Sequence, residues 1–224
     1  ALPCATAGMV VGVTVQSGLG LKFSGLIVAL ASGELTLALV LVMIGCIIMG
    51  MGLPTTAAYI LAAILMVPAL TELGVNEVAA HMFVFYFACI SMITPPVALA
   101  SYAASAIAQS PMGATGWTAF KIGFAGYLVP YAFVFGPALV LEGMWFDSVI
   151  QFGTATLGVY ALSGAVIGYL RRDNRLGESI VLFFAAVALI LPYTLASATG
   201  AVGLVAVLFI QSRRGKKVEE TTKL

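Results

Sequence analysis

The sequence predicts an all-α integral membrane protein, built as a bundle of transmembrane helices. Of its 224 residues, 62% are hydrophobic and only 8% are charged, whereas a soluble domain carries about 25% charged residues. Its mean hydropathy is +1.11, and several apolar stretches approach the ~20 residues that a helix needs to cross the hydrocarbon core. The net charge of +1 gives no reason to expect a nucleic-acid partner. Lipid is therefore the expected solvent, where backbone polar groups must be paired within the fold.

The C-terminal half predicts uninterrupted transmembrane helices. We expect apolar helices over 118–141, 149–170, 179–195 and 197–211. Toward the other end, residues 5–17 resemble the end of a further helix, and the Gly-rich residues 19–32 a short interfacial helix. We interpret 144–212 as extra transmembrane helices that hold no discontinuity and no buried polar cluster, so a purely structural role is one reading of them.

Basic residues predict the orientation of these helices. Arg171, Arg172 and Arg175 share one short loop, and a second group follows the last apolar run, namely Arg213, Arg214, Lys216 and Lys217. Basic loops face the cytoplasm, and two helices separate the groups, as that rule requires. The loop with Glu142 and Asp147 then lies outside. We therefore expect a cytoplasmic C-terminus, with residues 213–224 forming a basic tail without regular structure.

An interrupted apolar segment occupies about residues 35–70. Two arms of about 15 residues, 35–49 and 56–70, would each span about 22 Å, short of the ~30 Å core. The residues at the interruption are Gly50, Met51, Gly52, Leu53, Pro54, Thr55 and Thr56. This pattern predicts a re-entrant helical hairpin with its tip near mid-membrane and its mouth at Glu34, Glu72 and Glu77. An ordinary loop between two complete, tilted crossings is the alternative.

A second interruption lies within about residues 78–108. The apolar runs 78–92 and 97–108 are joined through Thr94, Pro95 and Pro96. Together they are long enough to cross the membrane once, as a broken helix followed by the helix at 118–141. A plain proline kink without a ligand role is the alternative. Paired interruptions of this kind are a sequence pointer to a transporter binding site.

The residue types at the two interruptions suit ion and anion binding. Pro54 fits the first turn of the second hairpin arm, and Thr94 is the expected N-cap of a helix starting at Pro95 and Pro96. Two helix N-termini meeting at mid-depth would attract an anion. The opposite ends, Ile48–Gly50 and Ser91–Ile93, would present free carbonyl oxygens to Na⁺. The candidate site therefore comprises the seven hairpin residues with Ser91, Thr94, Pro95 and Pro96, and Na⁺ is expected at the backbone near Gly50, Gly52, Ile93 and Thr94.

Other chemistry finds little support in the sequence. His81, the sole histidine, could carry protons or serve a structural role at the interface. No carboxylate lies in the middle of an apolar run, which favours sodium over protons as the coupling ion. Cys4, Cys46 and Cys89 are scattered without metal-ligand spacing and are expected to act as small hydrophobes. No nucleophile–base pair is evident at depth, so we expect neither an enzyme nor a cofactor.

Two motifs carry a resemblance to a known family. The run Gly50–Ile60 resembles the signature of large permease subunits, of the fused type, from TRAP (tripartite ATP-independent periplasmic) transporters, and Ile93–Leu99 resembles their Thr-Pro-Pro segment. Ala98 stands where most members carry Gly. The stretch Gly136–Gly143 is similar to permeases that work with TAXI-type binding proteins. The resemblance covers about residues 1–143 well and the rest loosely.

The resemblance implies more than the residues do alone. It implies an elevator-type symporter driven by a sodium gradient, which carries a small organic anion such as a carboxylate or C4-dicarboxylate across the bacterial inner membrane. It implies a periplasmic TAXI-type substrate-binding protein as partner. Residues 1–143 would form the second of two inverted repeats, with the first repeat upstream in a longer chain. A channel, a proton-coupled transporter of another family, and a structural membrane subunit are the alternatives.

Overall fold

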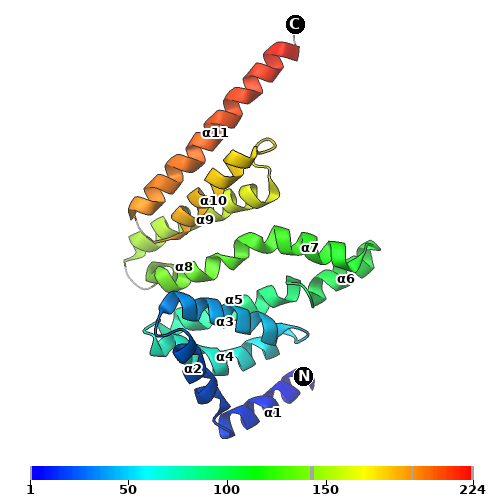
Figure 1. Ribbon diagram of the computed structural model, residues 1–224, viewed down its shortest axis with the longest axis vertical. Helices are drawn as coiled ribbons and strands as arrows, with labels where there is room; N and C mark the ends of the chain where they lie inside the picture. Colours follow the sequence, from blue (N-terminus) through cyan, green and yellow to red (C-terminus); the bar gives the residue numbers. More distant parts are fainter. Residues whose placement is uncertain (1, 142–143, 193, 223–224) are drawn as a thin grey trace. The chain divides into compact units, whose positions relative to one another are not determined.

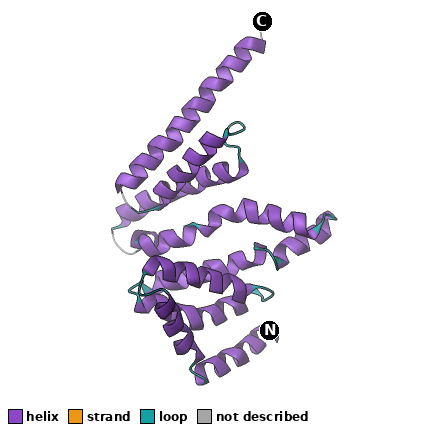
Figure 2. Cartoon of the chain, in the orientation of Figure 1, coloured by secondary structure: helices purple, strands orange, loops and turns teal. Residues whose placement is uncertain are grey.

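The computed structural model describes residues 2–141, 144–192 and 194–222, and it is built of helices (Figure 1). Figure 2 shows these helices joined by short loops, and the described residues contain no β-strand, only a bridge between Tyr169 and Asp173. The predicted all-α membrane bundle is confirmed. The chain divides into two compact units, Ala1–Gly123 and Phe124–Leu224, which are described separately.

The first unit follows the predicted order of arms and interruptions. Its elements are α1 (Leu2–Gln16), α2 (Leu19–Leu30), α3 (Leu35–Gly50), α4 (Thr55–Glu72), α5 (Glu77–Ile90), the 3₁₀ turn η1 (Ser91–Ile93), α6 (Leu99–Ala108) and α7 (Met112–Gly123). A bend of 73° separates α1 from α2, where Gly18 takes a left-handed φ of 66°. Asn76 caps α5, because its side-chain oxygen accepts hydrogen bonds from the Val78 and Ala79 amides at 2.8 and 3.2 Å.

The core of the first unit lies between α3, α4 and α5. Each helix turns one stripe inward, and the α4 stripe is rich in alanine, which lets the helices approach closely. Phe83 and Phe87 of α5 are fully buried, with ring centroids 4.9 Å apart in an edge-to-face arrangement. Phe85 is exposed and meets the Tyr59 ring edge-on at 5.3 Å. The phenylalanines of α5 therefore serve core packing on one side of this helix only.

Pro68 lies inside α4 and shapes its contact with α2. Proline has no amide hydrogen, so the Ile64 carbonyl loses its usual helical partner. Gly20 of α2 lies directly over this carbonyl: a Cβ built on Gly20 would be 3.1 Å from the Ile64 oxygen. The absence of a side chain at position 20 therefore allows α2 to cover an irregular turn of α4.

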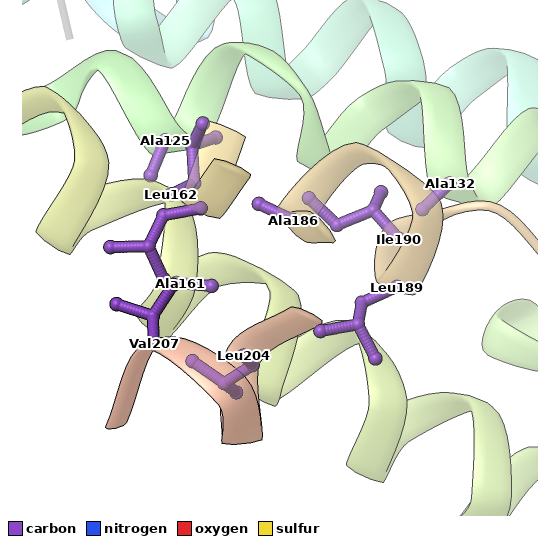
Figure 3. Packing of buried hydrophobic residues seen from close by; sticks show 10 residues of the cluster. Ala125, Ala132, Ala161, Leu162, Ala186, Leu189, Ile190, Leu204 and Val207 are labelled. Atoms are coloured by element: carbon purple, nitrogen blue, oxygen red, sulfur yellow. The ribbon is translucent and has the colours of Figure 1, made fainter. Parts of the chain in front are cut away.

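The second unit packs three long helices and a short irregular segment. Its elements are η2 (Phe124–Tyr127), α8 (Val129–Phe135), η3 (Pro137–Val140), α9 (Trp145–Ile167), α10 (Leu176–Ile190) and α11 (Thr194–Thr222). Figure 3 shows the buried cluster, in which Leu162 of α9, Leu189 of α10 and Leu204 of α11 take part. Gly200 brings α11 against α10, since a Cβ there would lie 2.6 Å from the Ala185 carbonyl oxygen. Glycine at this position therefore lets the two helix backbones approach closely.

Four helices of the described residues are long and apolar enough to cross a membrane: Thr55–Glu72, Met112–Phe135, Trp145–Ile167 and Leu195–Ser212. The helix expected over 118–141 instead starts at Met112 and is irregular after Gly123. The expectation of an unstructured tail was wrong, because α11 continues to Thr222. Glu142 and Gly143 lie outside the described residues.

The expectation that the extra helices hold no buried polar cluster was also wrong. Gln211 of α11 is only 1% exposed and Glu178 of α10 is 7% exposed. Gln211 binds Asn174 and the backbone of Arg171 in the loop before α10. These polar groups form one network, which ties that loop to α11.

Candidate functional site

The hairpin interruption is a tight turn between α3 and α4. Gly52 has a left-handed φ of 81°, which glycine adopts without strain. The Met51 amide donates to the Ile48 carbonyl and the Leu53 amide to the Gly50 carbonyl, both at 3.3 Å. The expectation that the Ile48 and Gly50 carbonyls would be free was therefore wrong, because each accepts a hydrogen bond. Pro54 lies one position earlier than predicted, at the N-cap of α4, and its carbonyl accepts from the Ala58 amide.

The second interruption separates α5 from α6. The helix tightens into η1, where the Ser91 hydroxyl donates to the Ala88 carbonyl and the Thr94 hydroxyl to the Ile90 carbonyl, each at 2.7 Å. The Thr94 amide also donates to the Ser91 carbonyl. The predicted N-cap role of Thr94 was wrong, because its side chain closes the first half of the broken helix. The second half begins only at Leu99.

The two interruptions meet at Gly50 and Ser91. Gly50 is the last residue of α3, and both residues are buried. A Cβ built on Gly50 would lie 2.7 Å from the Ser91 Cβ, well inside the ~3.5 Å at which carbon atoms make favourable contact. The end of α3 therefore touches the start of η1 through a position that only glycine fits. The remaining hairpin residues form the tip of the turn, where Gly52, Pro54 and Thr56 are exposed.

Residues of α6 and α7 enclose the Thr94–Ala98 loop. The Tyr102 hydroxyl of α6 donates to the Pro96 carbonyl, and the Pro95–Pro96 peptide is cis. Gly123 of α7 packs against the Ile93 side chain, and Gly116 lies beside the Tyr102 ring. Sequence reasoning missed Tyr102, which fixes the loop from six residues further along the chain.

Ser101 is the second polar residue that sequence reasoning missed. It lies in the first turn of α6 and is only 3% exposed, yet its hydroxyl has no hydrogen-bond partner among the described residues. A buried hydroxyl without a partner is costly, so its presence marks a place where a ligand or water is expected to bind. The spacing of Ser101 and Ser105, both buried on α6, was a signal in the sequence, since residues four apart share one helix face.

The polar groups around the interruptions are hydroxyls and backbone atoms. Ser91, Thr94 and Ser101 are buried there, and no carboxylate or cationic side chain belongs to the predicted set. Within the described part of the chain, no group of three His, Cys, Asp or Glu side chains could hold a metal ion. Such a lining offers a small ion oxygen atoms and helix dipoles rather than charged side chains.

His81 lies apart from this site, toward the other ends of α4 and α5. The Tyr59 hydroxyl is 3.0 Å from its Nδ1 atom. His81, Glu77 and Thr71 line a cavity of about 510 Å³. Its polar partners explain why an imidazole is accommodated there. Cys46 is buried and Cys89 half-buried, both as free thiols, while Cys4 lies outside the residues whose side chains are described.

Comparison with protein families shows which family the chain belongs to. The family model of the tripartite ATP-independent periplasmic transporter, DctM component, matches residues 1–147. The chain belongs to this family. No curated protein and no solved structure matches it. The match includes both interruptions and the Gly50–Ser91 contact, so the resemblance to TRAP permeases is confirmed. The TRAP permease is accordingly a multi-pass inner membrane protein of secondary organic-acid transport.

Proposed function

We propose that this TRAP permease is a sodium-coupled symporter of the elevator type, which carries a small carboxylate such as a C4-dicarboxylate. The observation that supports this most directly is the contact between Gly50 and Ser91. It joins the ends of two interrupted helices, where unpaired backbone groups can face a ligand. A chain of structural helices alone would have no need for such a junction.

Sodium is the proposed coupling ion because oxygen atoms dominate the junction. The carbonyls of Ile48, Gly50 and Ser91 each accept one turn hydrogen bond, but a carbonyl oxygen has two lone pairs. Each therefore keeps one acceptor site, and Na⁺ is proposed near the backbone of Gly50, Gly52, Ile93 and Thr94. The unpartnered Ser101 hydroxyl is a further oxygen in the adjoining helix.

The carboxylate substrate is proposed to bind at the start of α4. The first amides of this 18-residue helix have no intrahelical partners, and the helix dipole places partial positive charge there. Thr55 and Thr56 add hydroxyl groups at the same end. A periplasmic binding protein, proposed to be of the TAXI type, would deliver the substrate, and the C-terminus is proposed to be cytoplasmic.

Uptake measurements under separate ion gradients test the coupling. The full-length protein in vesicles, supplied with its binding protein and radiolabelled dicarboxylate, should accumulate substrate only when Na⁺ is high outside. A pH gradient alone should drive none. Accumulation driven by the pH gradient in sodium-free buffer would refute sodium coupling and turn attention to His81, which lines the 510 Å³ cavity together with Glu77.

Two substitutions test the site itself. Thr94→Val removes the hydroxyl that closes α5, and Pro54→Leu removes the residue that sets the start of α4. Both should impair transport while leaving membrane insertion intact. Thr118→Val is a matched control, because Thr118 makes the same kind of bond to the carbonyl four residues back, at 2.8 Å, on an exposed face. Normal uptake by both site variants would contradict the proposed site.

A further inference from the structure

A buried glutamine fastens the basic loop 168–175 to α11. The Gln211 side-chain oxygen accepts from the Arg171 amide at 3.2 Å, and its nitrogen donates to the Asn174 side-chain oxygen at 2.7 Å. The partners lie 40 and 37 residues apart in sequence. The end of the apolar part of α11 and the α9–α10 loop therefore occupy the same face of the second unit.

The loop itself is held by hydrogen bonds that point inward. The Asn174 side chain donates to the Gly164 carbonyl at 2.8 Å, and the Asn174 amide donates to the Gly168 carbonyl at 2.7 Å. The Arg175 amide donates to the buried Glu178 carboxylate at 3.1 Å. These bonds use backbone groups and the Asn174 and Glu178 side chains, whereas the side chains of Arg171, Arg172 and Arg175 are exposed. The fold thus exposes three guanidinium groups on a loop whose backbone is held by hydrogen bonds.

Four more basic residues follow Gln211 directly along the chain. They are Arg213, Arg214, Lys216 and Lys217, two to six positions further along the same helix. Asp173 is the exposed acidic residue of loop 168–175, and Glu178 is buried within the polar network. The loop, with three exposed arginines, therefore carries an excess of positive charge.

Exposed apolar side chains flank the loop. Ile167 and Tyr169 precede the arginines and are 58% and 54% exposed, and Leu176 follows them and is 83% exposed. The candidate spans Trp145–Ile167 and Leu195–Ser212 both end here. Tyrosine is typical of the membrane–water interface. The arginines thus lie at the boundary between the apolar core and water, within reach of lipid headgroups.

We propose that loop 168–175, held in place by Gln211 of α11, forms a binding site for the phosphate headgroup of an anionic phospholipid. Arginine binds phosphate through paired N–H donors, while Ile167, Tyr169 and Leu176 would contact the acyl chains. A free phosphate would use the charges but not this apolar border, so lipid is the occupant that matches both. This proposal does not depend on the coupling ion or the transported substrate.

Lipid retention by the purified full-length protein tests the site. The protein is exchanged into micelles containing equal amounts of phosphatidylglycerol and phosphatidylcholine, and bound lipid is counted by native mass spectrometry. The wild type should enrich phosphatidylglycerol, and 0.5 M salt should reduce the enrichment by screening. Removing each arginine should reduce it by about fivefold, since each basic residue near anionic lipid contributes about 1 kcal/mol. Equal retention of the two lipids would overturn the proposal.

Variants distinguish a defined lipid-binding site from general electrostatic attraction to basic residues. The triple variant Arg171→Gln, Arg172→Gln and Arg175→Gln should lose the preference, and the corresponding triple lysine variant should keep most of it. Lys22→Gln with Lys121→Gln removes basic residues elsewhere and should change nothing. Gln211→Ala keeps every charge but removes the hydrogen bonds that hold the loop to α11, so it should lower the enrichment severalfold. Wild-type enrichment in the triple Gln variant or in Gln211→Ala would refute the proposed site. If the triple Gln variant does not fold, Arg172→Gln alone tests the proposal. It should lower the phosphatidylglycerol enrichment about fivefold, and wild-type enrichment would refute the site.

Discussion

Replacing Gly50 by alanine is the most direct probe of the junction between the two interruptions. The added methyl group would lie 2.7 Å from the Ser91 Cβ. This atom is attached to the backbone of η1, so side-chain rotation cannot move it away. Relief requires the end of α3 and η1 to separate by about 0.8 Å, which restores the ~3.5 Å contact distance.

The cost and consequence of this separation follow from the geometry. Overpacking a buried position costs about 1–3 kcal/mol, so the variant should fold with a lower Tm. The proposed ion ligands lie on both sides of the widened contact, at Gly50 and at Ile93 and Thr94, and ion coordination tolerates little displacement. We therefore expect Gly50→Ala to reduce sodium-driven uptake by at least tenfold while the protein still inserts.

Uptake by purified variants in vesicles, with Na⁺ varied, checks this expectation. Gly25→Ala is the matched control, because a Cβ at Gly25 in α2 would meet no atom within 4 Å. The pair Gly50→Ala with Ser91→Gly adds a methyl group at position 50, removes the Ser91 side chain and so restores the space. If only packing matters, this pair should recover most activity; a hydroxyl role for Ser91 would keep it low. Unchanged uptake and unchanged sodium dependence in Gly50→Ala alone would refute the reasoning.

Three further outcomes are expected. Ser101→Ala should leave thermal stability unchanged or raise it, because it removes a buried hydroxyl without a partner. The same variant should lower uptake, and unchanged uptake would mean that Ser101 binds no ligand. Gly200→Ala should lower the Tm by overpacking against the Ala185 carbonyl, at about 1–3 kcal/mol, whereas Gly153→Ala, with open space around it, should not; equal Tm values would contradict the packing. Electron cryomicroscopy of the full-length protein in lipid nanodiscs should place Gly52 within about 8 Å of the midplane of the ~30 Å core, and a tip in the opposite headgroup layer would refute re-entry.

Much of the fold could be predicted because composition and run length constrain it strongly. The interruptions were found because glycine and proline punctuate an otherwise apolar sequence. The residues at which the helices begin after each interruption were predicted less well. The α6 helix starts at Leu99 rather than at Pro95, since the Tyr102 hydroxyl holds the Pro96 carbonyl in the loop. A single sequence does not show such a contact in advance.

The long-range contacts could not be predicted for the same reason. Gly50 and Ser91 lie 41 positions apart, and no pattern along the chain couples them. The buried network around Gln211 was missed because its members stand at the ends of apolar runs, where polar residues are normally expected in water. Ser101 was overlooked because a serine in an apolar helix usually bonds to its own backbone, whereas here it does not.

The depth of the hairpin tip is limited by the lengths of its arms. With 16 residues in α3 and 18 in α4, the arms measure about 24 and 27 Å at 1.5 Å per residue. Starting at the edge of the hydrocarbon core, untilted arms would pass the midplane, about 15 Å down. They would end at it only if tilted by about 50° or more, beyond the usual range of up to about 40°. Starting about 6 Å further out, in the headgroup layer, they would need tilts of only about 30–40°. Both arms end at exposed carboxylates, Glu34 and Glu72, which suit that outer position. The hairpin can therefore be re-entrant only as a tilted pair with its acidic mouth at the water edge, and the depth of Gly52 distinguishes it from two complete crossings.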